Sequence, residues 1–244
     1  MQQWAKLLSE KKLSTEELKQ LWDFLSHYIT PRRKALFEEK IAHRTYHITV
    51  AVEDIYQERN ASAVVRSAEC FGVQSVHIIE NHNEYKIAKG IAKGADKWVD
   101  LHLYDRKGQN NTEACLQALK ARGYRLVATT PHQDDCYIDE LDLSQPTAFI
   151  MGGEKDGLTP TAMSMADAFV KIPIYGFTES FNISVATAII LYESTRRLHQ
   201  STDIAWQLDE STRLQKLVEW ALKSVSDGSR LLMRFFEEQT NGIG

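Results

Sequence analysis

The chain has 244 residues, of which 43% are hydrophobic and 25% charged, and its formal net charge is −4 at pH 7. This composition is typical of a soluble globular protein and excludes disordered and fibrous classes. A chain with a net negative charge does not attract nucleic acid over its whole surface, so any such contact must come from local basic patches.

The cysteines and the apolar runs limit the chemistry and the location of the protein. Cys70, Cys115 and Cys136 are widely separated and lack the close Cys or His spacing of a zinc site, so we expect reduced thiols and no metal. There is no apolar signal core near Met1 and no apolar run of the ~20 residues that a membrane span needs. We therefore expect a cytoplasmic protein.

The first 45 residues are predicted to be helical. Ser14 and Glu17 fit a capping box, and apolar residues follow at helical spacing, which predicts a helix over 14–29. Thr30 and Pro31 end that helix and start another, which runs to about residue 43.

From Tyr46 onwards, strand patterns alternate with helix patterns. This alternation predicts an α/β fold in which helices cover both faces of a mostly parallel sheet. The predicted strands are 46–53, 75–80, 98–103, 124–129, 147–151 and 169–172, and the predicted helices are 60–71, 84–93, 110–122, 159–166 and 182–199.

Two further helices are predicted after the sheet region, over 209–223 and 227–239. The first has a leucine-rich face, which indicates packing against the sheet domain or against a second subunit. The expected organisation is a helical extension over 1–45, a sheet domain over 46–199 and a second helical extension over 200–244.

Two basic clusters are candidates for contact with phosphates. The segment 31–44 carries Arg32, Arg33, Lys34, Lys40 and Arg44 against Glu38 and Glu39, which is five minus two, or net +3. In the second cluster Lys86, Lys89, Lys93 and Lys97 are spaced so that they would share one face of a helix. Either cluster alone fits an ordinary solvated surface equally well, and the two together favour a nucleic-acid site.

Three short polar clusters, at 60–66, 152–154 and 180–182, each lie at the end of an apolar run. Function in open α/β sheets is found in such strand-to-helix loops, so the three clusters predict one composite site. The glycine patterns of dinucleotide and P-loop enzymes are missing, as are the serine elbow of hydrolases and the His-Glu-x-x-His metal helix.

The same clusters resemble, in order, the three motifs of the SpoU family of SPOUT RNA 2′-O-methyltransferases, over roughly residues 46–198. The matching segments are Asn60-x-x-Ala63-x-x-Arg66, then Met151 to Leu158, then Ile172-Pro173 with Ser180 to Ala186. Gly153 and Phe181 stand where many members have Asn and Leu, and neither change removes a polar group that the chemistry needs.

The flanking segments resemble the TrmH subfamily, which methylates guanosine-18 in the D-loop of tRNA. They are Thr30 to Arg33, Gly94 to Val99 and the helical C-terminal extension. The resemblance implies a homodimer, S-adenosyl-L-methionine as methyl donor, tRNA as partner, and an α/β sheet with a C-terminal trefoil knot. Knots are very rare, and the knot is expected from the resemblance alone.

The resemblance also implies the site residues. The catalytic set is Asn60, Arg66, Glu154, Ser180 and Asn182. The cofactor set is Thr129, Thr130, Met151, Gly152, Gly153, Glu154, Gly157, Ile172, Ser180, Phe181 and Asn182, with Ile172 and Phe181 flanking the adenine. The RNA set is Arg32, Arg33, Arg44 and Arg66, with Lys86, Lys89 and Lys93 as a secondary patch.

A ribose hydroxyl is a poor nucleophile, so its methylation needs help with proton removal or with stabilisation of the alkoxide. Arginine stays protonated in proteins, so we interpret Arg66 as a phosphate and charge-stabilising group rather than as a base. The alternative is a surface arginine paired with Glu69. Asn60 is expected to cap its helix, to orient Arg66 or the ribose, or both.

The remaining catalytic candidates have structural alternatives too. The Glu154 carboxylate is expected to contact a sulfonium or to hold neighbouring backbone amides. The alternative is an ordinary exposed glutamate in a turn. Ser180 and Asn182 precede a helix whose free amides bind oxygen atoms, and Asn182 is also a plain N-cap candidate.

The function predicted from the resemblance is S-adenosylmethionine-dependent 2′-O-methylation of tRNA, at guanosine-18. One alternative is the same chemistry on ribosomal RNA or at another tRNA position. Another is a dimeric RNA-binding protein without catalysis, against which the intact set of motif residues argues.

Overall fold

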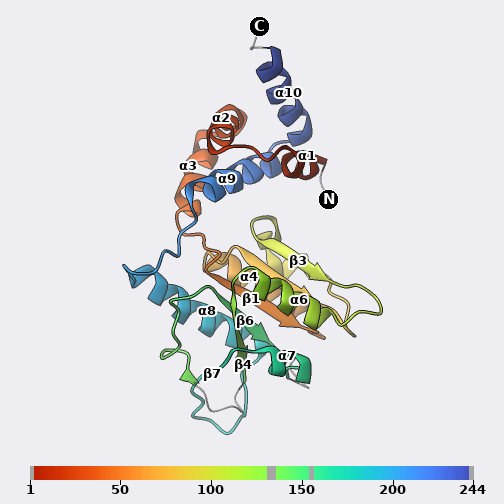
Figure 1. Ribbon diagram of the computed structural model, residues 1–244, viewed down its shortest axis with the longest axis vertical. Coiled ribbons are helices and arrows are strands. Elements are labelled where there is room, and N and C mark those ends of the chain that lie inside the picture. The colour runs from red at the N-terminus through yellow and green to blue at the C-terminus, as the bar shows by residue number, and fades with distance from the viewer. Residues whose placement is uncertain (1–2, 131–135, 154–156, 242–244) are drawn as a thin grey trace. The chain divides into compact units, whose positions relative to one another are not determined.

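The computed structural model describes residues 3–130, 136–153 and 157–241 (Figure 1). The chain divides into two compact units. The helical unit comprises Met1–Arg44 and Gln207–Gly244, and the sheet unit comprises Thr45–Trp206. The divisions fall one residue and seven residues from the expected boundaries at 45/46 and 199/200.

The helical unit contains α1 (Gln3–Lys11), α2 (Thr15–Ser26), α3 (Pro31–Ile41), α9 (Glu210–Ser224) and α10 (Gly228–Asn241). The predicted capping box is present, because the Glu17 amide donates to Ser14 Oγ at 3.3 Å and the Ser14 amide donates to Glu17 Oε2 at 2.8 Å. Thr30 caps α3, with Pro31 in its first turn. Helix α1 was not predicted.

The two terminal extensions, expected as separate parts, form this unit together. The leucine-rich face of α9 packs along α2 and α3, where Leu214, Leu217 and Val218 are buried. The Trp220 ring lies 5.5 Å from that of Phe37, centroid to centroid. Burial of this apolar face joins segments that are more than 160 residues apart in the sequence.

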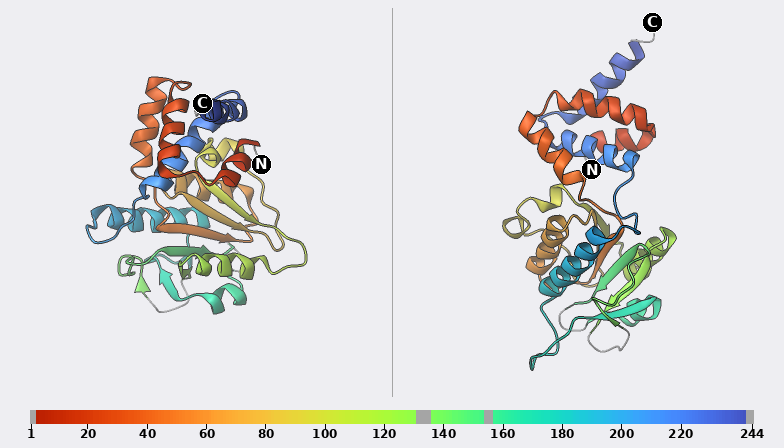
Figure 2. Two further views of the ribbon diagram at one scale, coloured as in Figure 1. Left: turned by 45° about the horizontal axis from the view of Figure 1, so that its top comes forward. Right: turned by 90° about the vertical axis from the view of Figure 1, so that its left-hand side faces the viewer.

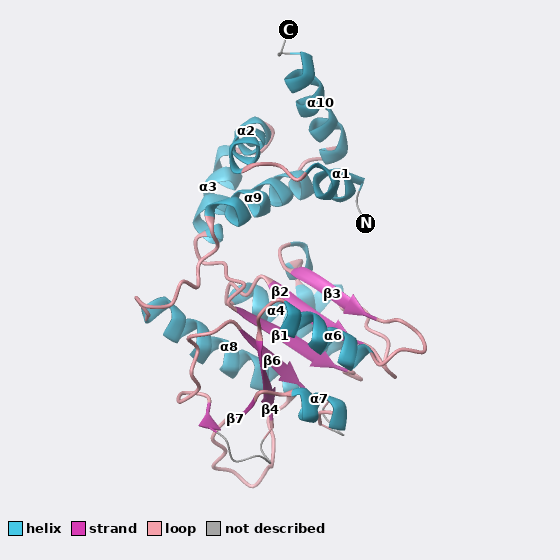
Figure 3. Ribbon diagram, viewed as in Figure 1, coloured by secondary structure: helices cyan, strands magenta, loops and turns pink. Residues whose placement is uncertain are grey.

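The strands of the sheet unit are β1 (Ile48–Glu53), β2 (Ser75–Ile79), β3 (Asp100–Tyr104), β4 (Arg125–Thr129), β5 (Cys136–Tyr137), β6 (Thr147–Met151) and β7 (Ala168–Lys171). They form one parallel sheet in the order β3-β2-β1-β6-β4-β7-β5 (Figure 3). The α/β prediction is confirmed. Every predicted strand is present, and the two-residue strand β5 was missed.

Helices cover both faces of the sheet (Figure 2). Helices α4 (Glu58–Cys70) and α8 (Ile183–Gln200) pack on one face, in a core with Val50, Val52 and Phe149. Helices α6 (Asn111–Ala121) and α7 (Pro160–Met165) pack on the other face, in a core with Ala51 and Ile150. Alternate residues of β1 and β6 therefore point into different cores, as expected for a buried parallel sheet.

The helix predicted over 84–93 is wrong. Only one turn, α5 (Lys89–Ala92), is helical, and it is followed by a short 3-10 turn at Ala95–Lys97. Lys93 and Gly94 have left-handed φ angles of 52° and 85°, which end the helix. Lys86, Lys89, Lys93 and Lys97 consequently do not share one helical face.

The carboxyl end of β1 ties three loops together through buried carboxylate contacts. Glu53 is 1% exposed and accepts hydrogen bonds from the Thr159 amide at 2.8 Å, from Thr159 Oγ1 at 2.7 Å and from Thr112 Oγ1. Thr159 caps α7, and Thr112 lies in the first turn of α6. The next residue, Asp54, has φ 52° and accepts from the amides of Asn81, His82 and Asn83.

No helix in the described part of the chain combines the length and apolar character that a bilayer crossing requires.

A buried histidine adds a pH-sensitive contact on the α6 face of the sheet. His77 in β2 is 1% exposed, and its ring stacks on His102 with centroids 4.5 Å apart. Burial, followed by the charges of His102 and Arg122, lowers the pKa of His77 to about 3. Since an unfolded histidine titrates near pH ~6.5, unfolding takes up a proton at this residue at every pH between these values.

We therefore predict that the free energy of unfolding falls as the pH is lowered below about 6.5, with a contribution from His77 of about 2 kcal/mol between pH ~7 and ~5. Denaturant unfolding of the wild type and of His77→Phe at both pH values measures this. The Phe variant should lose about 2 kcal/mol less, while His82→Gln, a change in an exposed loop, should behave as wild type. Equal pH dependence in all three proteins would contradict the assignment.

Candidate active site

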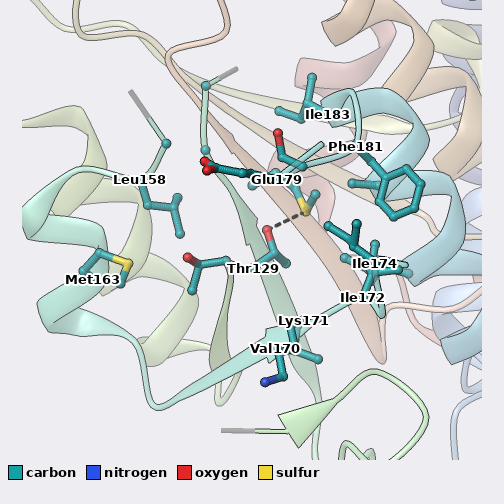
Figure 4. A pocket seen from close by; sticks show the side chains of 18 residues that line it. Thr129, Leu158, Met163, Val170, Lys171, Ile172, Ile174, Glu179, Phe181 and Ile183 are labelled. Atoms are coloured by element: carbon teal, nitrogen blue, oxygen red, sulfur yellow. Dashed lines mark hydrogen bonds between the residues drawn. The ribbon is translucent and has the colours of Figure 1, made fainter. Parts of the chain in front are cut away.

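A pocket of about 430 Å³ lies in the sheet unit at the carboxyl ends of β4, β6 and β7 (Figure 4). Its walls come from the ends of these strands, from the turn after β6 and from the segment that leads into α8. Most of the residues predicted to bind a cofactor line it: Thr129, Thr130, Met151, Gly152, Gly153, Gly157, Ile172, Ser180 and Phe181. Glu154 lies outside the described residues.

The turn after β6 is held in a tight form by its own backbone. The Gly153 amide donates to Gly157 O at 3.1 Å, and the Gly157 amide donates to Gly153 O at 3.0 Å. A Cβ at Gly152 would lie 2.5 Å from Leu158 N and 2.6 Å from Gly157 O, which no side chain tolerates. Glycine at 152 thus lets two stretches of backbone touch beside the pocket.

The pocket has both apolar and polar walls, with somewhat more apolar surface. Met151, Leu158, Met163, Ile172 and Ile183 contribute its apolar side chains. The Thr129 hydroxyl donates to Ile150 O at 2.9 Å, so its proton is used within the sheet. Such a pocket, with a few polar groups at its rim, suits a ligand with a flat apolar part.

Asn60 and Asn182, which are 122 residues apart in sequence, contact each other directly, with Asn182 Nδ2 3.3 Å from Asn60 Oδ1. Asn182 is the N-cap of α8, because its Oδ1 accepts from the Ser184 amide at 2.9 Å. The contact joins the first and third motifs next to Ser180, which lines the pocket. Asn182 itself is not among the lining residues.

The prediction that Asn60 caps its helix is wrong. Helix α4 begins at Glu58 and its N-cap is Gln57, whose side chain makes no capping hydrogen bond. Asn60 is the third residue of the helix and only 8% exposed. Its side chain contacts Asn182 at the start of α8.

Arg66 lies on α4 nearly two turns beyond Asn60, with an exposed side chain. Its Nη1 donates to Ile91 O over 3.5 Å, a weak contact. Among the described residues it forms no ion pair, so the alternative pairing with Glu69 is not present. Arg66 does not line the pocket, and the structure leaves its guanidinium at the surface.

The residues predicted to bind RNA fall into two groups. Arg32 and Arg33 are exposed in the first turn of α3, and Lys86, Lys89 and Lys93 are exposed around α5. Arg44 differs from the prediction, because it is only 4% exposed and its guanidinium lies 5.3 Å from the centroid of the Trp220 ring. A buried, ring-stacked arginine is not available to a phosphate.

Two charged residues of the pocket, Lys171 and Glu179, were missed in the sequence. Glu179 lines the pocket directly before Ser180. The signal that would have found Glu179 is its position directly before the third motif.

The model of the SpoU rRNA Methylase family matches residues 47–192. The chain belongs to this family. It is similar to the tRNA (guanosine(18)-2′-O)-methyltransferase of Borreliella burgdorferi, with 36% identity over 189 residues, which cover 78% of this chain and 84% of that one.

Solved structures of the family share the fold. The crystal structure of the A. aeolicus TrmH/SpoU tRNA modifying enzyme matches with a TM-score of 0.70 and 31% identity, over 80% of this chain and 97% of that chain. The SpoU methyltransferase AviRb from Streptomyces viridochromogenes, in complex with the cofactor AdoMet, matches with a TM-score of 0.55 and 24% identity, over 67% of this chain and 62% of that chain.

Because the turn is tight, we predict that alanine substitution has very different effects at the adjacent residues Gly152 and Gly153. Gly152→Ala should open the turn, lower the stability of the protein by about 1–3 kcal/mol and abolish measurable ligand binding in the pocket. Gly153→Ala is the matched control, because among the described residues the nearest neighbour of its Cβ is 3.6 Å away. Thermal unfolding and calorimetric titration with S-adenosylmethionine measure both effects. Equal behaviour of the two variants would show that the close approach at Gly152 is unimportant.

Proposed function

We propose that this protein is a tRNA ribose 2′-O-methyltransferase that uses S-adenosylmethionine and acts on guanosine-18 of the D-loop. The observation that carries the proposal is that one pocket gathers residues of the second and third motifs, while the Asn60–Asn182 contact brings the first motif to its edge. The similarity to a named tRNA (guanosine(18)-2′-O)-methyltransferase extends over 78% of the chain.

The pocket fits the expected methyl donor. Its volume of about 430 Å³ is within the range of small-molecule sites, ~300–1,000 Å³. Ile172 and Phe181 offer apolar surface to the adenine, and Thr130 and Gly152 line the same pocket. When bound, S-adenosylmethionine supplies a methyl group on a sulfonium that is ready for attack by a nucleophilic oxygen.

The side chains around the pocket have distinct proposed roles. Asn60 and Asn182 hold the ends of α4 and α8 together and orient the ribose, and Ser180 offers a hydroxyl on the pocket side. Arg66 holds a phosphate of the target RNA and stabilises the negative charge that develops on the ribose oxygen. Its exposed position suits a group that meets the RNA rather than the methyl donor.

Basic side chains elsewhere would add phosphate contacts. Arg32 and Arg33 of the helical unit, together with Lys86, Lys89 and Lys93 of the sheet unit, are the proposed RNA contacts. We leave Arg44 out of this set because it is buried.

We also propose that two copies associate through α8. Val185 and Tyr192 are seven residues apart, so they lie on one side of α8, and they are 46% and 57% exposed. An exposed apolar stripe of this kind marks an association surface. Phe71 of α4 extends it, with its ring 6.2 Å from that of Tyr192.

Two further features of the family are part of the proposal. A trefoil knot in the C-terminal half of the sheet unit is supported by the position of α8, whose Arg197 donates to Ile138 O at 3.0 Å and to Leu141 O at 2.6 Å. These bonds fasten the end of α8 to the segment that precedes β6. A cytoplasmic location follows from the tRNA substrate.

The modified nucleotide can be mapped directly. With labelled methyl donor and an unmodified tRNA transcript, we expect label at guanosine-18 and none in a matched transcript carrying 2′-deoxyguanosine there. Arg66→Ala should lower kcat/KM by about 100-fold or more, and Arg66→Lys should also be poor because lysine lacks the planar fork. Label in ribosomal RNA instead, or no transfer with intact RNA binding, would support the alternatives.

Association is tested by adding a charge to the α8 stripe. Val185→Glu should shift the protein from dimer to monomer in sedimentation velocity, because burying an unpaired carboxylate in an apolar interface is costly. Ala121→Glu adds the same charge to exposed α6 and should leave the dimer intact. A wild-type protein that sediments as a monomer would refute the proposed dimer.

A further inference from the structure

The pocket contains a carboxylate that has no partner among the described residues. Of the described residues that line it, only Lys171 and Glu179 carry a full charge. The Lys171 ammonium lies 4.8 Å from the centroid of the Tyr137 ring on β5. Glu179 makes no hydrogen bond or ion pair with any described residue, and its side chain extends between Leu158 and Ile183 (Figure 4).

The position of Glu179 in the chain indicates that its carboxylate lies near the sulfur of a bound methyl donor. It directly precedes Ser180 and stands three residues before Asn182, which contacts Asn60 at the start of α4. Glu179 therefore lies on the side of the pocket where the first and third motifs meet. A donor that transfers its methyl group to a ribose held there must turn its sulfur to the same side.

We propose that Glu179 is a specificity-determining residue that recognises the positive charge of the methyl donor. S-adenosylmethionine carries a sulfonium, whereas S-adenosylhomocysteine, the product, has lost that charge together with the methyl group. A carboxylate beside the sulfur stabilises the donor and not the product, so it favours binding of the first and release of the second. This inference rests on the proposed function of the same pocket.

The size of the effect follows from the exposure of the carboxylate. Glu179 is exposed in the open pocket, so solvent screens its attraction to a cation. We expect a preference of about three- to tenfold, which is the range of a partly screened ion pair.

Calorimetric titration of the full-length protein tests the proposal with three ligands. They are S-adenosylmethionine, S-adenosylhomocysteine, and sinefungin, which carries a protonated amine in place of the sulfonium. Glu179→Gln should weaken the two cationic ligands about three- to tenfold and change the affinity for S-adenosylhomocysteine by less than twofold. Glu237→Gln, the same charge change on α10 of the helical unit, should alter none of the three.

The outcomes separate this inference from the proposed function. If Glu179→Gln weakens all three ligands equally, or none of them, the charge-recognition role is wrong while the pocket remains a methyl-donor site. If the wild type binds none of the three, both the inference and the proposed function fail. Raising the salt concentration should reduce the preference for the cationic ligands in the wild type and leave the Gln variant unchanged.

Discussion

Parallel pairing of β1 with β6 is the constraint on which the rest of the site depends. The register places Val52 opposite Met151, so both strands end at the same edge of the sheet. The first motif follows one of these strands and the second follows the other. A shift of one residue would exchange the two cores, because alternate side chains of β1 face opposite sides. The buried contacts of Glu53 with Thr112 and Thr159 then fix the starts of α6 and α7 to that edge.

In this arrangement the backbone and the side chains make different contributions to the pocket. The pocket is shaped by strand ends and by the glycine turn, in which Gly152 allows contact between two stretches of main chain. The side chains at its edge come from two parts of the chain, Asn60 from α4 and Glu179 and Ser180 from the segment that leads into α8. Backbone gives the site its shape and side chains give it polarity, so substitutions such as Gly153 for Asn and Phe181 for Leu are tolerated more readily than a change at Gly152.

Much of the sheet unit was predictable from the sequence because its signals are local. Six strands and the long helices follow from periodicity, capping residues and glycines, and the ordered motifs identified the lining of the pocket. The errors share a physical origin. The expected helix over 84–93 failed at Lys93 and Gly94, whose left-handed backbone ends the helix after one turn. The local pattern at Asn60 indicates a helix cap, because its partner Asn182 lies 122 residues away and leaves no local signal.

Long-range packing explains what else was missed. The sequence around Arg44 gives no sign of a contact with Trp220. Arg44 is nevertheless buried, with its guanidinium over the Trp220 ring. The two terminal segments form one helical unit because α2 packs against α9, and this long-range contact is also not visible in a local pattern. Charge counted along the sequence therefore overstates the basic surface of residues 31–44, while Arg32 and Arg33, at the start of α3, remain exposed.

The exposed position of Arg66 has a consequence for the order of events in the proposed reaction. The pocket proposed for the methyl donor lies in the sheet unit, whereas the guanidinium of Arg66 lies outside it and makes one long contact to Ile91 O. An arginine held this weakly is free to turn toward a phosphate when RNA arrives. Charge stabilisation at the ribose oxygen would then be complete only with substrate in place. Water that enters the open pocket would meet a methyl donor but not the group that promotes attack on it, which protects the donor from hydrolysis.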